Sequence, residues 1–306
     1  MMPPTMNGAV YGDCKLECEF DSGPGGARQR LAHAAESGCF ATTGTEGSRV
    51  SAELFQELGY TSVAVTQKSY NGVAILSRSP ITVVSTALVG AEADGHARFL
   101  EAVIRDIHVA NVYLPNGNPP GSDKFSYKLA WMDRLQRQMQ IWAESEKPTL
   151  VGGDFNVIPE DIDCHKPSSW MYDALFQPEP RARYRAYLGI GYIEAFRYLH
   201  PGEGSYFTFW DYFRKAFEYN RGIRIDHFLL SPKLAPRLES CEIDKGRKRW
   251  RSRRTTPRFW FSCGIVHEMA RWSVFLHSAA KDFAVGGQLL SDRVPAMGRL
   301  LKQLFG

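Results

Sequence analysis

The sequence predicts an α/β fold, and three observations support that prediction. Short apolar runs bounded by turn residues recur through the middle of the chain, as expected of strands. Residues 125–146 carry apolar side chains at helical spacing, which indicates an amphipathic helix. After this helix, the apolar run 149–151 has the pattern of a buried strand bounded by a glycine pair. The apolar helix positions are Leu129, Met132, Leu135 and Met139.

The expected elements can be placed in chain order. They are a short helix over 51–58, strands over 62–65 and 72–77 around a hairpin-like turn at 67–72, strands over 98–104 and 107–114, the helix over 125–146, the strand before Gly152, a looser region over 158–190, a helix over 193–198 and a strand over 224–230.

Bulk composition narrows the class of protein. The 306 residues suffice for one large or two ordinary domains, and 44% hydrophobic with 23% charged residues is typical of globular proteins. The net charge of +4 mildly favours a polyanionic partner. Six cysteines without paired spacing predict neither disulfides nor a zinc site, and they favour a reducing cytoplasm. No membrane-length apolar run or signal peptide is visible.

Changes in composition and in hydrophobic periodicity along the chain predict three segments. Residues 1–49 have no strand or helix period and are expected to be irregular, residues 50–246 form the folded domain, and residues 247–306 form an irregular basic segment. Lys245 to Arg258 carries eight lysines or arginines. This basic run could bind nucleic acid, although such runs are usually solvated or disordered.

Asp154 and Asn156 follow the central apolar strand, at a position where α/β enzymes commonly place their chemistry. Residues i and i+2 of an extended segment point the same way, so the two side chains can converge on one ligand. Oxygen donors of this kind suit a hard cation and a phosphate. A glycine turn with a capping aspartate is the alternative interpretation.

Blocks spread through the ordered middle of the chain resemble one known family. They are Gln67 to Ser77, Arg98 to Glu101, Asn111 to Gly117, Lys128 to Trp131, Gly152 to Val157, Phe209 to Tyr212 and Asn220 to His227. In order and spacing over residues 50–245, they resemble the exodeoxyribonuclease III family of apurinic/apyrimidinic endonucleases, within the endonuclease/exonuclease/phosphatase superfamily.

The resemblance implies a four-layer sandwich of two mixed β-sheets flanked by helices. The implied activity is Mg²⁺-dependent hydrolysis of phosphodiesters at abasic sites and from the 3′ ends of duplex DNA, by a monomer, with Mn²⁺ as a substitute metal. Such hydrolysis needs a cation, a base for water and a donor at the phosphate. The alternatives are a non-catalytic DNA-binding remnant that uses 247–258, and another superfamily phosphodiesterase.

By the same resemblance, four residues match catalytic positions. Asp154 matches the acid that exchanges a proton with water or the leaving oxygen, and Asn156 the residue that stabilises the transition state; both match positions at the metal. Tyr113 matches the phenol at the scissile phosphate, and Asp226 a supporting carboxylate. The implied DNA-binding residues are Asn71, Arg98, Asn116, Trp210 and Arg224. Taken alone, Tyr113 and Trp210 would be assigned to the core. Glu194 stands where the family usually has Asp.

Three family motifs are absent from the sequence. They are an amino-terminal W-N-V-N-S followed by R-A-R, a P-D-V-L-L-L-Q-E-x-K whose Glu binds Mg²⁺, and a carboxy-terminal K-P-S-D-H-x-P-V. Each missing motif can be encoded in a neighbouring reading frame by permitted codons for the residues that stand in its place. Codons for Ser37 to Gly47, for example, can give P-D-V-L-L-L-Q-E-L-K one base later.

We therefore interpret residues about 11–48 and from about 247 onward as out-of-frame translation. Without the Glu, Asn and His of these motifs, this exact chain is expected to be inactive or crippled and poorly stable, because catalytic groups act as a unit.

Overall fold

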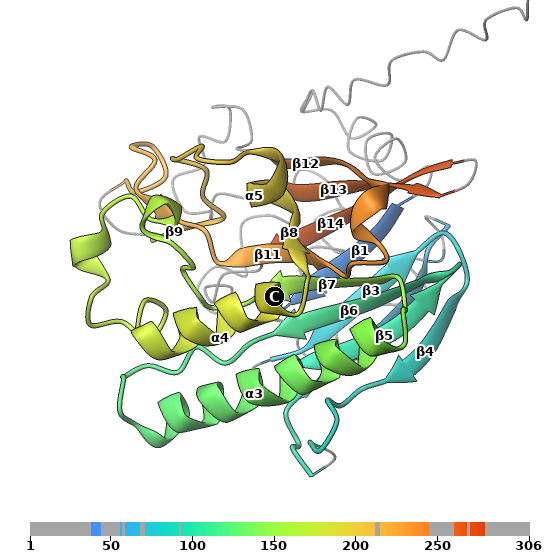
Figure 1. Ribbon diagram of the computed structural model, residues 1–306, viewed down its shortest axis with the longest axis horizontal. Coiled ribbons are helices and arrows are strands. Elements are labelled where there is room, and N and C mark those ends of the chain that lie inside the picture. Colours follow the sequence, from blue (N-terminus) through green and yellow to red (C-terminus); the bar gives the residue numbers. More distant parts are fainter. Residues whose placement is uncertain are drawn as a thin grey trace, which may run out of the picture.

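The computed structural model describes residues 38–43, 56, 59–67, 71–91, 93–211, 215–244, 260–267 and 270–278. These residues form two six-stranded sheets and a two-stranded ribbon (Figure 1). The predicted helix over 51–58, apart from Gln56, and the basic run 247–258 lie outside the described residues.

The first sheet has the strand order β12-β13-β14-β1-β3-β2. Strand β1 pairs in parallel with β14 and antiparallel with β3, so the sheet is mixed. Its strands are β1 (Gly38–Thr43), β2 (Thr61–Val65), β3 (Val73–Ser77), β12 (Leu238–Asp244), β13 (Trp260–His267) and β14 (Ala270–Ser278).

The second sheet has the order β4-β5-β6-β7-β11-β8. Strands β6 and β7 are parallel, whereas β7 and β11 are antiparallel, so this sheet is also mixed. Its strands are β4 (Ile81–Ser85), β5 (Phe99–Ile104), β6 (Ile107–Tyr113), β7 (Thr149–Asp154), β8 (Ile193–Glu194) and β11 (Asp226–Leu230). The ribbon pairs β9 (Phe209–Trp210) with β10 (Gly222–Ile223).

Helices α3 (Asp123–Glu144) and α4 (Pro178–Gly189) run side by side across one face of the second sheet (Figure 1). The hydroxyl of Ser122 accepts from the amide of Phe125 and caps the start of α3. The apolar face of α3 packs on β6 and β7 and on tyrosines of α4. The buried residues of this layer include Val112, Met132, Leu135, Met139, Val151 and Tyr187.

The opposite face of the second sheet packs against the first sheet. Val73 and Ile75 of β3 share one buried cluster with Leu100 and Ala102 of β5 and with Phe228 of β11. The predicted pair of mixed sheets with helices is therefore confirmed. Among the described helices, none is long and apolar enough to cross a membrane.

Several predicted elements need correction. Strand β1 lies in the segment 1–49, and β13 and β14 lie in 247–306, so these stretches are not irregular throughout. The region 158–190 contains helix α4 and the short 3₁₀ turns Asp161–Asp163 and Pro167–Ser169. The stretch predicted as a helix over 193–198 begins as strand β8 and becomes helix α5 (Ala195–Leu199) only afterwards. A last 3₁₀ turn, Ala235–Arg237, leads into β12.

Candidate active site

Tyr113, Asp154 and Asp226 form one row across three neighbouring strands. Tyr113 is the cross-strand partner of Asp154, and Asp154 is the partner of Asp226. Directly opposed residues project from the same face of a sheet. Two residues on from Asp226, Phe228 points into the core between the two sheets. Because side chains alternate along a strand, the row projects toward the same space between the sheets.

The two carboxylates of the row are buried together. Asp154 is 7% exposed and Asp226 is 1% exposed. Burial, and then the negative charge of Asp154, raise the pKa of Asp226 well above its ordinary value. A buried like-charge pair of this kind favours either a proton or a cation between its members.

Arg98 and Tyr113 form a basic and phenolic pair at the end of the row. The guanidinium of Arg98 lies 5.0 Å from the centre of the Tyr113 ring, and its Nη1 donates to the Tyr113 carbonyl at 3.0 Å. Burial, and then the charge of Asp154, raise the pKa of the Tyr113 phenol to about 12. The phenol therefore keeps its proton at neutral pH and can act as a hydrogen-bond donor.

Asn156 stands two residues beyond Asp154 with a left-handed backbone, at φ +46°. Its amide N–H donates to Asp154 Oδ1 at 2.8 Å, and its side-chain Nδ2 donates to the Leu114 carbonyl at 2.8 Å. Asn116 Nδ2 in turn donates to Asn156 Oδ1 at 3.2 Å. The loops that follow β6 and β7 are thus joined at the end of the row.

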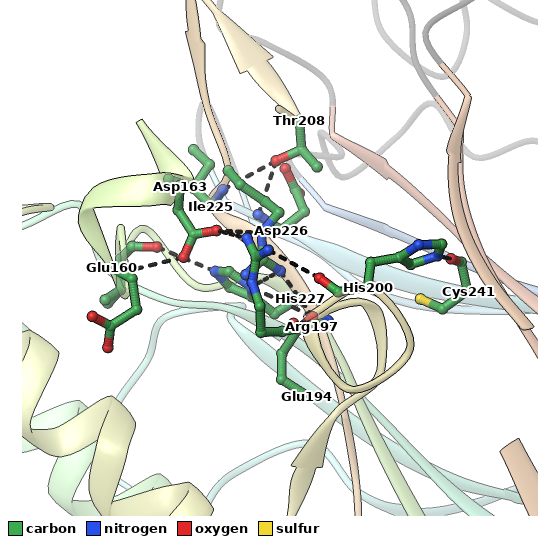
Figure 2. Close-up of polar contacts among 12 residues, drawn as sticks. Glu160, Asp163, Glu194, Arg197, His200, Thr208, Ile225, Asp226, His227 and Cys241 are labelled. Carbon is green, nitrogen blue, oxygen red and sulfur yellow. Dashed lines mark hydrogen bonds and ion pairs between the residues drawn. The ribbon is translucent and has the colours of Figure 1, made fainter. Parts of the chain in front are cut away.

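Thr208 holds the backbone that carries Asp226. Its hydroxyl oxygen accepts hydrogen bonds from the amides of Ile225 at 3.0 Å and Asp226 at 3.1 Å (Figure 2). Thr208 is fully buried. Thr208 therefore supports the site from a buried position. The only sequence signal for this role is its place directly before the Phe209-Trp210 block.

The residues present fit a hard divalent cation in part. Asp226 Oδ2 is buried and has no hydrogen-bond partner among the described residues, as expected of an oxygen that waits for a ligand. Carboxylate and amide oxygens are the ligands that Mg²⁺ prefers. Within the described part of the chain, however, no group of three or more His, Cys, Asp or Glu side chains gathers around one point.

Comparison with known proteins decides the family. The model of the endonuclease/exonuclease/phosphatase family matches residues 19–262 of this chain. The chain belongs to this family. It is 32% identical over 202 residues to exodeoxyribonuclease III of Haemophilus influenzae, a match that covers 62% of this chain and 76% of that protein. A Bacillus subtilis exodeoxyribonuclease is 29% identical over 178 residues, covering 58% of this chain and 69% of that protein.

Solved structures in the same family share the fold. The 3′ phosphatase NExo from Neisseria, bound to a product DNA hairpin, gives a TM-score of 0.69 at 28% identity, covering 75% of this chain and 89% of that one. An AP endonuclease from Archaeoglobus fulgidus gives a TM-score of 0.64 at 33% identity, covering 67% and 80%. The relatives named here are nucleases and phosphatases, that is, hydrolases of phosphate esters.

Two of the predicted DNA-binding residues, Asn71 and Trp210, are buried. Asn71 is 7% exposed, and the Gly72 amide donates to the Ala97 carbonyl at 2.7 Å, which brings Asn71 near Arg98. Trp210 is 3% exposed and packs edge-on against Phe217, with ring centroids 5.0 Å apart. Trp210 thus sits in the core in this structure, and its predicted role in DNA binding stays a prediction.

Arg224, another predicted DNA-binding residue, is enclosed among charged side chains in this structure. It is 1% exposed, and its guanidinium pairs with Asp163 Oδ1 at 2.9 Å and Glu194 Oε1 at 2.9 Å. Arg197 also pairs with Asp163 (Figure 2). His227 Nδ1 lies 3.0 Å from Nη1 of the Arg224 guanidinium. The guanidinium is therefore engaged by protein carboxylates in this structure, and its predicted contact with DNA stays a prediction. Sequence analysis did not predict these ion pairs, because Asp163 and Glu194 lie far from Arg224 along the chain.

Proposed function

We propose that this chain is built for metal-dependent hydrolysis of DNA phosphodiesters, at abasic sites and from the 3′ ends of duplexes. The observation that carries the proposal is the row Tyr113–Asp154–Asp226, which gathers a phenol and two carboxylates at the end of the inter-sheet space. The names of the relatives, which include an exodeoxyribonuclease and an AP endonuclease, support DNA as the substrate class.

Each residue of the site has a proposed task in that reaction. Asp154 exchanges a proton with the attacking water or with the leaving oxygen. The protonated phenol of Tyr113 donates to the phosphate, and Arg98 adds positive charge beside it. Asn156, fixed by its bonds to Asp154 and Leu114, stabilises the transition state.

Mg²⁺ is the proposed metal, with Mn²⁺ as a substitute. Asp154 and Asn156 would hold it, next to the unbonded Oδ2 of Asp226. A bound divalent cation supplies charge neutralisation and Lewis acidity at the phosphate. Water and substrate oxygens complete such coordination shells where a protein offers few carboxylates.

We also propose that the chain as given has little of this activity. Residues about 11–48 and from about 247 onward are proposed to be out-of-frame, and the family motifs with the metal-binding Glu, the Asn and the His are absent from the sequence. A monomeric state and a cytoplasmic location remain parts of the proposal as well.

The test compares two proteins on one substrate. The source DNA is resequenced across codons 10–50 and 244–268, and a chain with both frames restored is produced beside the chain as given. Each is mixed with a labelled duplex that contains one abasic site, with Mg²⁺ or with EDTA. We expect Mg²⁺-dependent incision by the restored chain, its loss in the Asp154→Asn variant, and incision reduced by more than about 100-fold in the chain as given.

Each arm can contradict a different part of the proposal. A restored chain that leaves both abasic sites and 3′ ends intact overturns the proposed reaction. Incision by the chain as given at the restored rate overturns the proposed loss of activity. Source codons that cannot encode the missing motifs overturn the proposed change of frame.

A further inference from the structure

Lys128 lies on the face of helix α3 that packs on the second sheet. Its side chain is fully buried, although it ends in an ammonium group. Its neighbours on that face are apolar side chains such as Met132 and Leu135. A buried ammonium costs free energy unless every donor finds an acceptor. An apolar side chain at this position would fill the space without that cost, so the ammonium calls for an explanation.

The Lys128 ammonium donates to three carbonyl oxygens from three separate segments. Nζ lies 3.0 Å from the Asn116 oxygen, 2.6 Å from the Asn156 oxygen and 3.1 Å from the Ala174 oxygen. An ammonium has three N–H donors, so its hydrogen-bonding capacity is filled. The three acceptors belong to the loop after β6, the loop after β7 and the segment before α4.

Other hydrogen bonds among these three segments come from side-chain amides and from the backbone, where the Ile158 amide donates to the Leu175 carbonyl at 2.8 Å. Asn116 Nδ2 donates to Asn156 Oδ1 at 3.2 Å. Asn118 Nδ2 donates to both carboxylate oxygens of Asp173 at 3.1 Å, and Asn118 Oδ1 accepts from the Ala174 amide at 2.8 Å. The Lys128 ammonium donates to one carbonyl in each of the three segments.

The surroundings leave the Lys128 stem little freedom. Gly117, at φ +84°, lies against it, and a Cβ added there would stand 2.6 Å from Lys128 Cδ. A side chain held along its length has a defined position for its terminal charge. The ammonium therefore acts as a fixed point for the Asn156 peptide, whose left-handed φ of +46° is a conformation that most residues avoid.

From this geometry we infer that Lys128 is a positioning residue for the proposed hydrolysis. Its ammonium fixes the Asn156 peptide against the loop after β6, so that the Asn156 side chain is presented beside Asp154. The inference rests on the proposed function, and it assigns Lys128 no contact with DNA or metal. Misplacement of a catalytic group by about 1 Å can cost about 100-fold in rate, which sets the expected scale.

The first arm of the test needs no catalysis. Amide hydrogen exchange is compared in the chain as given, in Lys128→Met, and in Lys124→Met, a control on the exposed face of the same helix. We expect exchange about tenfold faster over 114–118 and 155–158 in Lys128→Met, with strand β5 unchanged. Lys124→Met should match the unmodified chain. Because burial lowers the pKa of Lys128 to about 7, the samples are kept at pH 6, where the ammonium predominates.

The second arm measures incision of abasic duplex DNA by variants of the chain with both frames restored. We expect Lys128→Met to lower kcat by about 100-fold with KM changed less than about twofold, and Lys128→Arg to recover about tenfold of that loss. In an Asn156→Ala background, Lys128→Met should cost less than about threefold, because the residue through which it acts is already gone. Lys128→Gln replaces Lys128→Met if the latter does not fold.

Three results would overturn the inference: local exchange and kcat like those of Lys124→Met, an equal loss in both Asn156 backgrounds, or exchange that rises everywhere alike. If the chain with both frames restored incises no DNA, the proposed function fails. In that case the exchange arm alone decides whether Lys128 fixes the two loops.

Discussion

Asp154 and Asp226 stand directly opposite each other on the antiparallel strands β7 and β11. Both side chains are buried, and no described side chain donates a hydrogen bond to Asp226 Oδ2. Like charges directly opposite each other destabilise a sheet. The burial of Asp226 and the charge of Asp154 raise the Asp226 pKa well above its ordinary value, so this carboxyl binds a proton more readily than a free aspartate does. The pair therefore lowers folding stability, and a bound cation would relieve this cost.

The first prediction concerns Asp226→Asn. A folded-state pKa above the unfolded value means that the native protein binds more protons, so stability falls as the pH rises from about 4 through the raised pKa. We expect Asp226→Asn to flatten that fall in the free energy of unfolding, measured by urea denaturation between pH 5 and 8. It should also remove any stabilisation by Mg²⁺.

The matched control for Asp226→Asn is Asp161→Asn, whose carboxylate is 69% exposed. This variant should keep the pH dependence of the unmodified chain. An Asp226→Asn variant that loses stability at pH 8, and still gains from Mg²⁺, would contradict the shared-proton interpretation.

The second prediction concerns Gly153 of β7. A Cβ built at this residue would stand 1.9 Å from the Val112 carbonyl oxygen of β6, and the backbone has φ +147°. We expect Gly153→Ala to lower the free energy of unfolding by more than about 3 kcal/mol, because the β6–β7 ladder must separate.

Gly189 of α4 supplies the contrast for this second prediction, since a Cβ there meets nothing within 4 Å. Gly189→Ala should be neutral or stabilising by up to about 1 kcal/mol. Thermal and urea unfolding of both variants measure the difference, and equal effects would contradict the close approach of β6 and β7.

The glycine pair also shows which part of the site could be predicted from the sequence. Gly152-Gly153 was interpreted as the end of the strand, yet β7 continues through it to Asp154. Glycine here permits close packing of two strands rather than a turn. Local pattern therefore located Asp154 and Asn156, but the row with Tyr113 and Asp226 arises from strand pairing that no local pattern encodes.

Helix α3 shows a second limit of local pattern. Its periodicity predicted the helix and a stripe that includes Leu129, whereas the buried stripe passes through Lys128 and Leu129 is half-buried. A lysine at a core position is the signal that sequence alone could have offered. Its acceptors are backbone carbonyls in distant loops, which composition and spacing do not reveal.

The third prediction concerns the buried Arg224. Removing its charge leaves Asp163 and Glu194 buried without their main partner. We expect Arg224→Met to cost about 3–5 kcal/mol in the free energy of unfolding, the usual cost of breaking a buried ion pair. Arg183→Met removes a partly exposed pair with Asp133 and should cost less than about 1 kcal/mol.

Folded Arg224→Met protein should bind duplex DNA as tightly as the unmodified chain, since the guanidinium is enclosed. Fluorescence anisotropy at two salt concentrations measures this affinity. A variant that is stable but loses DNA affinity would support the predicted DNA contact of Arg224.

The fourth prediction concerns acid unfolding. Burial alone would raise the pKa of Asp163, but the charge and hydrogen bond of Arg224, together with the charge of Arg197, outweigh it and lower the pKa. Burial likewise opposes the lowering of the Glu194 pKa, which the charge of Arg224 dominates. Groups with depressed pKa values stabilise the fold above their unfolded values near 4, and this stability is lost as the pH falls through the folded values.

Buried His227 acts in the same direction from a higher pH. Burial, and then the charge of Arg224, lower its pKa from 6.5, so the unfolded chain takes up a proton that the native state refuses. We therefore expect the urea midpoint to fall from about pH 6.5 downward and steeply below about pH 4. Measurement in the Asp226→Asn background separates this loss from the opposite dependence of the carboxylate pair. Asp163→Asn should make the decline below pH 4 shallower; an unchanged slope would show that the Asp163–Arg224 pair does not govern acid stability.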